Sequence, residues 1–130
     1  MKVYILLSAC MVFLLACHKE MACNNESGDL LIRFENNSGE NLKKLVVAGR
    51  EIGDLNDGDA TCYLAYPEFD FDGSLPDESC SAEVKSNTIE GMDNFYFCGT
   101  EKFTETSGKF DVEITKVDYE KESFLQLLLK

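Results

Sequence analysis

Histidine is almost absent from this chain of 130 residues, in which His18 is the only one. Enzymes that activate a serine or cysteine nucleophile most often use histidine as the neighbouring base. His18 lies near the N-terminus, ahead of the first predicted strand, so a nucleophile in the folded part of the chain has no such base. We therefore interpret the protein as a non-catalytic one.

Basic residues are also scarce, since 12 lysines and arginines face 24 aspartates and glutamates. Proteins bind nucleic acids through clusters of Lys and Arg side chains that contact the phosphates. The excess of acidic over basic residues therefore excludes nucleic acid as a partner. An acidic surface keeps a domain soluble and attracts positively charged molecules. If a protein partner binds through charge, we expect that partner to be cationic.

The apolar run at residues 3–15 is too short to span a bilayer as a stable anchor and has the length of a secretory signal peptide core. It ends in Leu14-Leu15-Ala16-Cys17, which resembles the lipobox of bacterial lipoproteins. The resemblance implies cleavage before Cys17 and attachment of lipid to that cysteine. Cleavage by an ordinary signal peptidase after Ala16 is the alternative. Cys23 does not fit a lipobox, because Glu20 stands where an aliphatic residue is needed.

The resemblance divides the chain into a lipoprotein signal peptide (1–16), a lipidated tether (17–28) and a domain (29–130). The mature 114 residues suffice for one domain and are too few for two. Loss of one lysine with the signal peptide leaves 11 basic and 24 acidic side chains, and hence a net charge of −13. We expect a protein of the cell envelope that is held to the outer membrane through Cys17. Both the periplasmic face and the cell-surface face of that membrane fit this expectation.

Cys10 leaves with the signal peptide and Cys17 carries lipid, so four cysteines remain. An even number of cysteines in an oxidising compartment favours disulfides, here two. These four are Cys23, Cys62, Cys80 and Cys98. Zinc ligands usually come in closely spaced pairs, and the chain has no Cys-x-x-Cys. We expect no metal and no cofactor.

Spacing favours one disulfide connectivity. Cys80 and Cys98 lie symmetrically about Ile89, in a turn-prone stretch (87–93), so a hairpin centred there would place them opposite each other. Opposed residues in an antiparallel pair are close enough for a disulfide. Cys23 would then pair with Cys62.

A rival pairing, Cys62 with Cys80, stays open because the same spacing argument applies to it. Pro67 and Pro76 interrupt the hairpin that this rival requires, because proline donates no hydrogen bond to a strand ladder. We therefore prefer Cys80 with Cys98.

Short runs with alternating apolar residues, separated by turn signals, predict strands and no long helix. Inward-facing side chains are expected at Leu30, Ile32 and Phe34, at Phe110, Val112 and Ile114, and at Leu125, Leu127 and Leu129 of a last strand that we place centrally in the core. The predicted strands are 30–35, 42–47, a short one at Ile52, 60–66, 80–85, 94–98, 109–117 and 124–129, with an acidic loop or ragged hairpin at 68–78.

Seven to eight such strands predict an antiparallel β-sandwich. Three short motifs are similar to bacterial immunoglobulin-like modules, and together with the lipobox they resemble the small lipoproteins of Bacteroidota. The resemblance implies an immunoglobulin-like fold and carries no activity with it. The motifs are Asn36-x-Ser38-Gly39, Val46-Val47-x-Gly49 and Ile52-Gly53-x-Leu55-x-x-Gly58.

Two acidic segments are candidate sites that we interpret as turns. Glu68, Asp70 and Asp72 could supply a pair of catalytic carboxylates, but acidic residues beside a glycine usually form a solvated turn. The segment 54–59 holds oxygen ligands that calcium accepts, but it has Asp59 where an EF-hand loop needs glycine.

The sequence thus favours a lipid-anchored interaction or structural module whose partner it does not identify. An acidic inhibitor of a cationic enzyme such as lysozyme is the alternative, since charge would steer the two together. Ser107-Gly108-Lys109-Phe110 resembles the Ser-Gly-x-Lys-Tyr loop of bacterial lysozyme-inhibitor lipoproteins.

Overall fold

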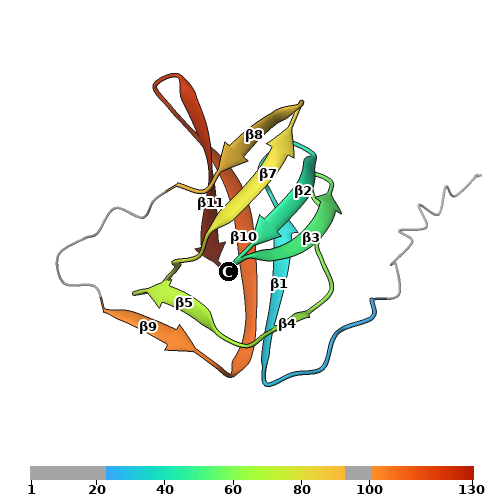
Figure 1. Cartoon of the computed structure of the whole chain (residues 1–130), viewed down its shortest axis with the longest axis vertical. Coiled ribbons are helices and arrows are strands. Elements are labelled where there is room, and N and C mark those ends of the chain that lie inside the picture. Colours follow the sequence, from blue (N-terminus) through green and yellow to red (C-terminus); the bar gives the residue numbers. More distant parts are fainter. Residues whose placement is uncertain (1–22, 93–100) are drawn as a thin grey trace, which may run out of the picture.

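The computed structural model describes residues 23–92 and 101–130, and within these ranges the chain is built of strands and turns with no helix (Figure 1). The all-β prediction is confirmed. The strands are β1 (Leu30–Asn36), β2 (Leu42–Val47), β3 (Arg50–Leu55), β4 (Leu64–Tyr66), β5 (Phe69–Asp72), β6 (Leu75–Pro76), β7 (Cys80–Val84), β8 (Asn87–Glu90), β9 (Lys102–Glu105), β10 (Gly108–Tyr119) and β11 (Glu122–Leu129). The predicted strand at 94–98 lies outside the described residues.

One sheet has the strand order β11-β10-β1-β4, and its central pair is parallel. Leu30 lies opposite Gly108 and the register continues to Asn36 opposite Ile114. The prediction of a purely antiparallel sheet is therefore wrong for β1 and β10. Parallel neighbours need a long connection between them, and here that connection is most of the domain.

A second sheet, of order β3-β2-β7-β8, lies in front of the first in Figure 1, and a small third sheet of order β6-β5-β9 lies at one end. The two larger sheets enclose one apolar core, an arrangement compatible with the predicted β-sandwich. The core residues include Leu30, Ile32, Phe34, Val112, Ile114 and Leu125 from the first sheet and Leu45, Val47, Ala82 and Val84 from the second.

The segment 68–78, predicted as an acidic loop or a ragged hairpin, is a short hairpin of β5 and β6. It contributes two of the most deeply buried side chains, because Phe69 and Phe71 of β5 are 0% and 2% exposed. The ring of Phe69 packs 6.3 Å from that of Phe34 and 5.6 Å from that of Tyr66 between ring centroids. Between the two buried rings Asp70 is exposed, as the alternation of a strand requires, whereas Asp72 at the end of β5 is buried.

The predicted turn at 87–93 is likewise wrong, because β7 and β8 reverse two residues earlier. Lys85 and Ser86 form the turn, with φ angles of +49° and +69°, and Val84 pairs with Asn87. Tight two-residue hairpins need positive φ at both positions, and sequences usually provide glycine or asparagine there. Lysine and serine give no such signal, so the sequence placed the turn in the wrong stretch.

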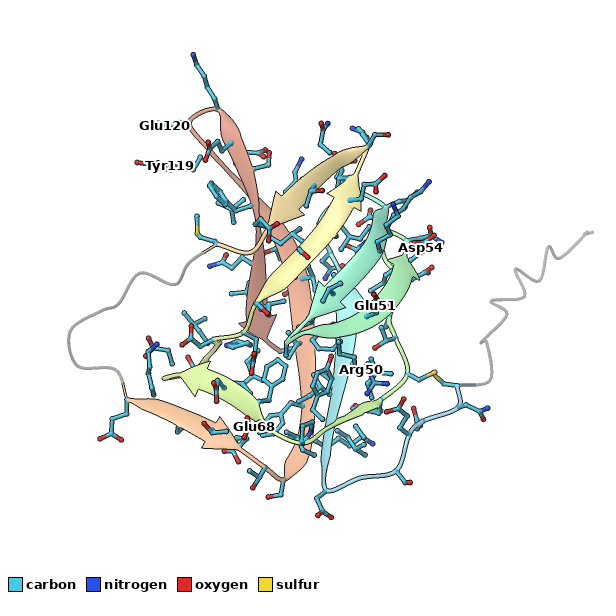
Figure 2. All side chains as sticks on the ribbon, in the orientation of Figure 1. Arg50, Glu51, Asp54, Glu68, Tyr119 and Glu120 are labelled. Atoms are coloured by element: carbon cyan, nitrogen blue, oxygen red, sulfur yellow. A yellow bond between two sulfur atoms is a disulfide. The ribbon has the colours of Figure 1, made fainter. Side chains whose placement is uncertain are left out.

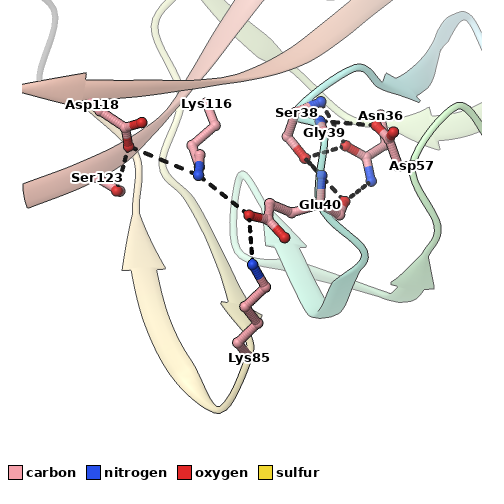
Figure 3. Close-up of polar contacts among 9 residues, drawn as sticks. All are labelled: Asn36, Ser38, Gly39, Glu40, Asp57, Lys85, Lys116, Asp118 and Ser123. Carbon is pink, nitrogen blue, oxygen red and sulfur yellow. Dashed lines mark hydrogen bonds and ion pairs between the residues drawn. The ribbon is translucent and has the colours of Figure 1, made fainter.

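Asn36 occupies the end of β1 and is fully buried, and its amide is completely hydrogen-bonded (Figure 3). Its Nδ2 donates to the carbonyls of Glu40 and Leu55, both at 2.8 Å. Its Oδ1 accepts from the backbone N–H of Ser38 at 3.0 Å and from the Ser38 hydroxyl. The Asn-x-Ser-Gly motif therefore closes the β1–β2 connection with a satisfied buried amide.

Glu40 connects three parts of the fold, as Figure 3 shows. Its carboxylate accepts hydrogen bonds from Lys85 in the β7–β8 turn at 3.2 Å and from Lys116 of β10 at 3.4 Å. The hydrogen bond from Lys85 is the largest influence holding the pKa of Glu40 below its ordinary value; desolvation opposes it, and Lys116 adds to it. These two hydrogen bonds connect the β7–β8 turn of the second sheet with β10 of the first sheet.

The last strand, β11, stands at the edge of its sheet and contributes to the core, where the sequence places it. Leu125 and Leu127 are nonetheless buried at 1% and 6% exposed, whereas Leu129 is 39% exposed and the prediction of an inward side chain is wrong there. The alternation places all three on one face, but Leu129 lies at the end of β11, where the sheet offers it little cover.

Leu125→Ala should lower the free energy of unfolding by about 2 to 5 kcal/mol, because it opens a cavity under a fully buried side chain. Leu129→Ala is the matched control on the same strand and should change it by about 0.5 kcal/mol or less. Urea unfolding followed by circular dichroism measures both. Equal effects of the two substitutions would contradict the assignment of Leu125 to the core.

Candidate functional site

The N-terminal end of the described chain is covalently fixed to the domain by a disulfide between Cys23 and Cys62, whose Cα atoms lie 5.4 Å apart. This is the pairing that the sequence predicts for these two cysteines, and it excludes the rival pairing of Cys62 with Cys80. Figure 2 shows the bond at the point where the chain enters the domain. Cys62 directly precedes Tyr63 and the short strand β4.

Backbone hydrogen bonds continue this attachment along β4. Glu26 N–H donates to the carbonyl of Tyr63 at 2.9 Å, and Tyr63 N–H donates to Oδ1 of Asn25 at 3.0 Å. Ala65 N–H donates to Oε2 of Glu26 at 2.7 Å. Residues 23–28 thus cover the edge of β4 that does not pair with β1. A covered edge cannot pair with strands of other chains. Residues 23–28, the last part of the predicted tether 17–28, are docked on the sheet, with Cys23 fixed to Cys62.

Arg50 and Glu26 form a clamp over this junction. The Arg50 guanidinium donates to both carboxylate oxygens of Glu26 and to the carbonyl of Ala65, and it lies 5.5 Å from the ring centroid of Tyr66. The Arg50 hydrogen bond is the largest influence holding the pKa of Glu26 below its ordinary value. Sequence reasoning missed the clamp, because its members come from a polar tether and a separate strand and form no motif.

Beside the junction, Tyr63 lies between two cations on the outer face of the first sheet. The guanidinium carbon of Arg33 is 5.3 Å and the ammonium of Lys109 is 4.0 Å from the ring centroid, both within cation–π range. The Tyr63 hydroxyl donates to Asp111 at 2.8 Å, and Arg33 Nε donates to the same oxygen at 2.8 Å. The hydrogen bond to Asp111 raises the pKa of Tyr63.

The same contacts locate the segment 107–110 that resembles an inhibitor loop. Gly108 and Lys109 begin β10, where they pair with Leu30 and Leu31 of β1. Lys109 extends onto the Tyr63 ring. The segment is therefore the start of a paired strand in the first sheet.

Cys80 is a buried free thiol, and the hairpin centred at Ile89, from which its pairing with Cys98 was predicted, does not form. Because the β7–β8 turn falls at 85–86, Ser81 lies opposite Glu90. Gly91, whose N–H donates to the Cys80 carbonyl at 2.6 Å, occupies the next position along. Cys98 lies outside the described residues.

A groove of about 720 Å³ opens beside Cys80, between β6, β7, the end of β8 and β11. Burial raises the pKa of the Cys80 thiol to about 12, so it is protonated and a poor nucleophile at neutral pH. Burial likewise raises the pKa of Glu78. The lining residues are Pro76, Asp77, Glu78, Ser79, Cys80, Glu90, Gly91, Met92, Phe124, Leu125 and Leu127.

The carboxylates considered for catalysis are tied into the third sheet. Asp70 accepts a hydrogen bond from Thr104 Oγ1 at 2.6 Å, and its own N–H donates to Glu78. Asp72 is only 7% exposed and Glu68 lies on the surface just before β5. The side chains of these residues therefore stand in different surroundings.

The segment 54–59 uses its oxygens to build turns. Asp54 Oδ1 accepts the Lys44 N–H at 3.1 Å, and Asp57 Oδ1 accepts the Gly39 N–H at 2.9 Å. Asn56 donates to Asp59 at 3.3 Å. In residues 23–92 and 101–130, no three His, Cys, Asp or Glu side chains are grouped so that they could hold a metal ion.

No protein-family model matches this chain, and comparisons with curated proteins and with solved structures give no significant match. In the part of the chain that the structure describes, no helix has the length and apolar character to cross a membrane.

Acid should abolish the effect of the clamp on stability. Glu26 has a lowered pKa in the folded protein, so its stabilisation is complete above the ordinary value of 4.5 and is lost as the pH falls through the lowered value. Glu26→Gln should therefore be less stable than the wild type at pH 7, and the difference should shrink as the pH falls below 4.5. Urea unfolding between pH 3 and pH 7 measures it.

Glu51→Gln, on the exposed side of the strand that begins with Arg50, is the matched control and should stay close to the wild type at pH 7. A deficit of Glu26→Gln that persists unchanged at pH 3 would show that the ion pair is not its cause.

Cys80 should resist alkylation in the folded protein, because its thiol is buried and protonated. Iodoacetamide at pH 8 should modify it only after unfolding, and peptide mapping without reductant should join Cys23 to Cys62. A peptide that joins Cys80 to another cysteine would refute the free thiol.

Proposed function

We propose that this protein is a lipid-anchored, non-catalytic module of the bacterial cell envelope, released from its signal peptide at residue 16 and held to the outer membrane by Cys17. The observation that carries the proposal is the Cys23–Cys62 disulfide. Structural disulfides persist in oxidising compartments outside the cytoplasm, which is where the apolar run and the lipobox-like motif would send the chain.

The position of the disulfide also suits an anchored protein. Cys23 comes six residues after Cys17, so any pull on the lipidated end is transmitted to the sheet through a covalent bond. The Arg50–Glu26 clamp and the hydrogen bonds to β4 reinforce the same point.

A binding or structural role is supported by the chemistry of the described side chains. The Cys80 thiol is buried and protonated, and Asp70 of the third sheet and Asp54 of the segment 54–59 accept hydrogen bonds from Thr104 and from the Lys44 N–H. An immunoglobulin-like arrangement of the two sheets fits such a role and is part of the proposal. Inhibition of a cationic enzyme such as lysozyme stays a prediction from charge and the segment 107–110.

Cys17→Ser should abolish incorporation of radiolabelled palmitate and remove the protein from the detergent phase of Triton X-114. Several acyl chains hold a protein to a membrane almost permanently, at about 0.8 kcal/mol for each buried CH₂ group, so the change should be complete. Cys23→Ser is the control, and it should retain the label although it breaks the disulfide. Palmitate incorporation into the Cys17→Ser protein would disprove the anchor.

A further inference from the structure

The groove beside Cys80 is lined by apolar side chains over much of its length. Leu125 and Leu127 of β11 are buried along it, and Phe124 and Met92 are half-buried beside them. Its volume of about 720 Å³ falls in the range of clefts that hold drug-sized ligands, roughly 300 to 1,000 Å³. The groove is therefore large enough to receive a side chain together with part of its backbone.

The polar part of the lining is acidic. Asp77, Glu78 and Glu90 line the groove, and in the part of the chain that the structure describes no lysine or arginine does. Asp77 pairs at 2.8 Å with Lys102, which lies outside the lining. Within residues 23–92 and 101–130, Glu78 and Glu90 form no ion pair. The groove thus carries negative charge that its neighbours do not neutralise.

Glu78 differs from the other half-buried carboxylate described above. Glu40 meets two lysines, whereas Glu78 accepts the backbone N–H of Asp70 at 2.8 Å and has no cation beside it. Burial raises the pKa of Glu78, and the carboxylates of Asp70 and Asp77 act in the same direction. A charge that is partly removed from water is stabilised when an opposite charge replaces the lost hydration. A cation from outside the chain would supply that charge here.

The two parts of the lining select the chemistry of the occupant. Lysine and arginine side chains bury an apolar stem along apolar surface and keep a charged tip at its polar border. In this groove the stem can pack on Phe124 and Leu127 while the tip meets Glu78 or Glu90. A small inorganic cation would leave the apolar lining uncovered, and a purely apolar group would leave Glu78 desolvated without a partner.

From these observations we infer that the groove beside Cys80 binds an extended peptide segment of a partner protein, in which lysine or arginine alternates with apolar residues. The net charge of −13 on the mature chain steers such a cationic partner toward the domain. The inference deepens the proposed function as an interaction module and rests on it, because it names the surface that binds and the chemistry of what is bound.

Isothermal titration calorimetry with the peptide acetyl-Leu-Lys-Leu-Lys-amide tests the inference. The full-length protein is purified in a non-ionic detergent, and detergent alone serves as the blank. The peptide should bind saturably, with a Kd below about 1 mM. Acetyl-Ser-Lys-Ser-Lys-amide, which has the same charge, should bind at least about fivefold more weakly, because it leaves the apolar lining uncovered.

Variants of the groove locate the site. Glu78→Gln should weaken binding roughly tenfold, because it removes one partner of a half-buried charge pair. The substitution keeps an oxygen that can accept the Asp70 N–H, so the fold should persist. Glu90→Gln, at an exposed position, should weaken binding roughly threefold. Glu51→Gln on β3 is the matched control with the same change in net charge, and its effect should stay below about twofold.

The possible outcomes separate this inference from its rivals. Equal weakening by Glu78→Gln and Glu51→Gln would show attraction by net charge alone and overturn the site. Equal binding of the leucine and serine peptides would do the same. Displacement of the peptide by an equal concentration of spermine would show a polyamine site and overturn the assignment to a protein partner.

The outcomes also distinguish the groove from the anchor. No saturable binding at about 1 mM peptide, in protein whose mass shows the acyl chains, would overturn the groove as a binding site and leave the lipid-anchored module standing. A mass without acyl chains would overturn the anchor, and peptide binding that is sensitive to Glu78→Gln in that preparation would still support the groove.

Discussion

The parallel pairing of β1 with β10 is the constraint on which the rest of this structure depends. It brings Ile32 and Phe34 beside Phe110 and Val112, although the paired residues are 78 positions apart in the sequence. The inward side chains of this pair line one side of the core. On its outward side, Arg33 pairs with Asp111, and Lys109 lies over the ring of Tyr63.

The N-terminal junction depends on this pair as well. β4 is placed by its antiparallel register with β1, in which Leu31 lies opposite Ala65. Only when β4 is in place can its edge receive residues 23–28 and bring Cys62 within bonding distance of Cys23. One long-range pairing thus determines the core, the attachment of the entering chain and the charge pattern near it. Closing so long a loop costs conformational entropy, and the burial of apolar residues offsets that cost.

The sequence by itself determined the features that depend on local pattern. Alternation predicted the inward residues Leu30, Ile32 and Phe34 of β1 and Val112 and Ile114 of β10. The apolar run and its lipobox-like end are the basis of the prediction of export. These follow from side-chain period and composition, which a linear sequence displays directly.

Only the tertiary structure decided which strands are neighbours and therefore which polar residues meet. The parallel register, the burial of Phe69 and Phe71 and the clamp between Arg50 and Glu26 all join segments far apart in the chain. The β7–β8 turn was missed for a different reason: its positive φ angles fall on Lys85 and Ser86, and surrounding strand pairing imposes a conformation that these residues do not favour on their own. Long-range pairing energy overrides local preference at such positions, and that energy is not visible in the local sequence.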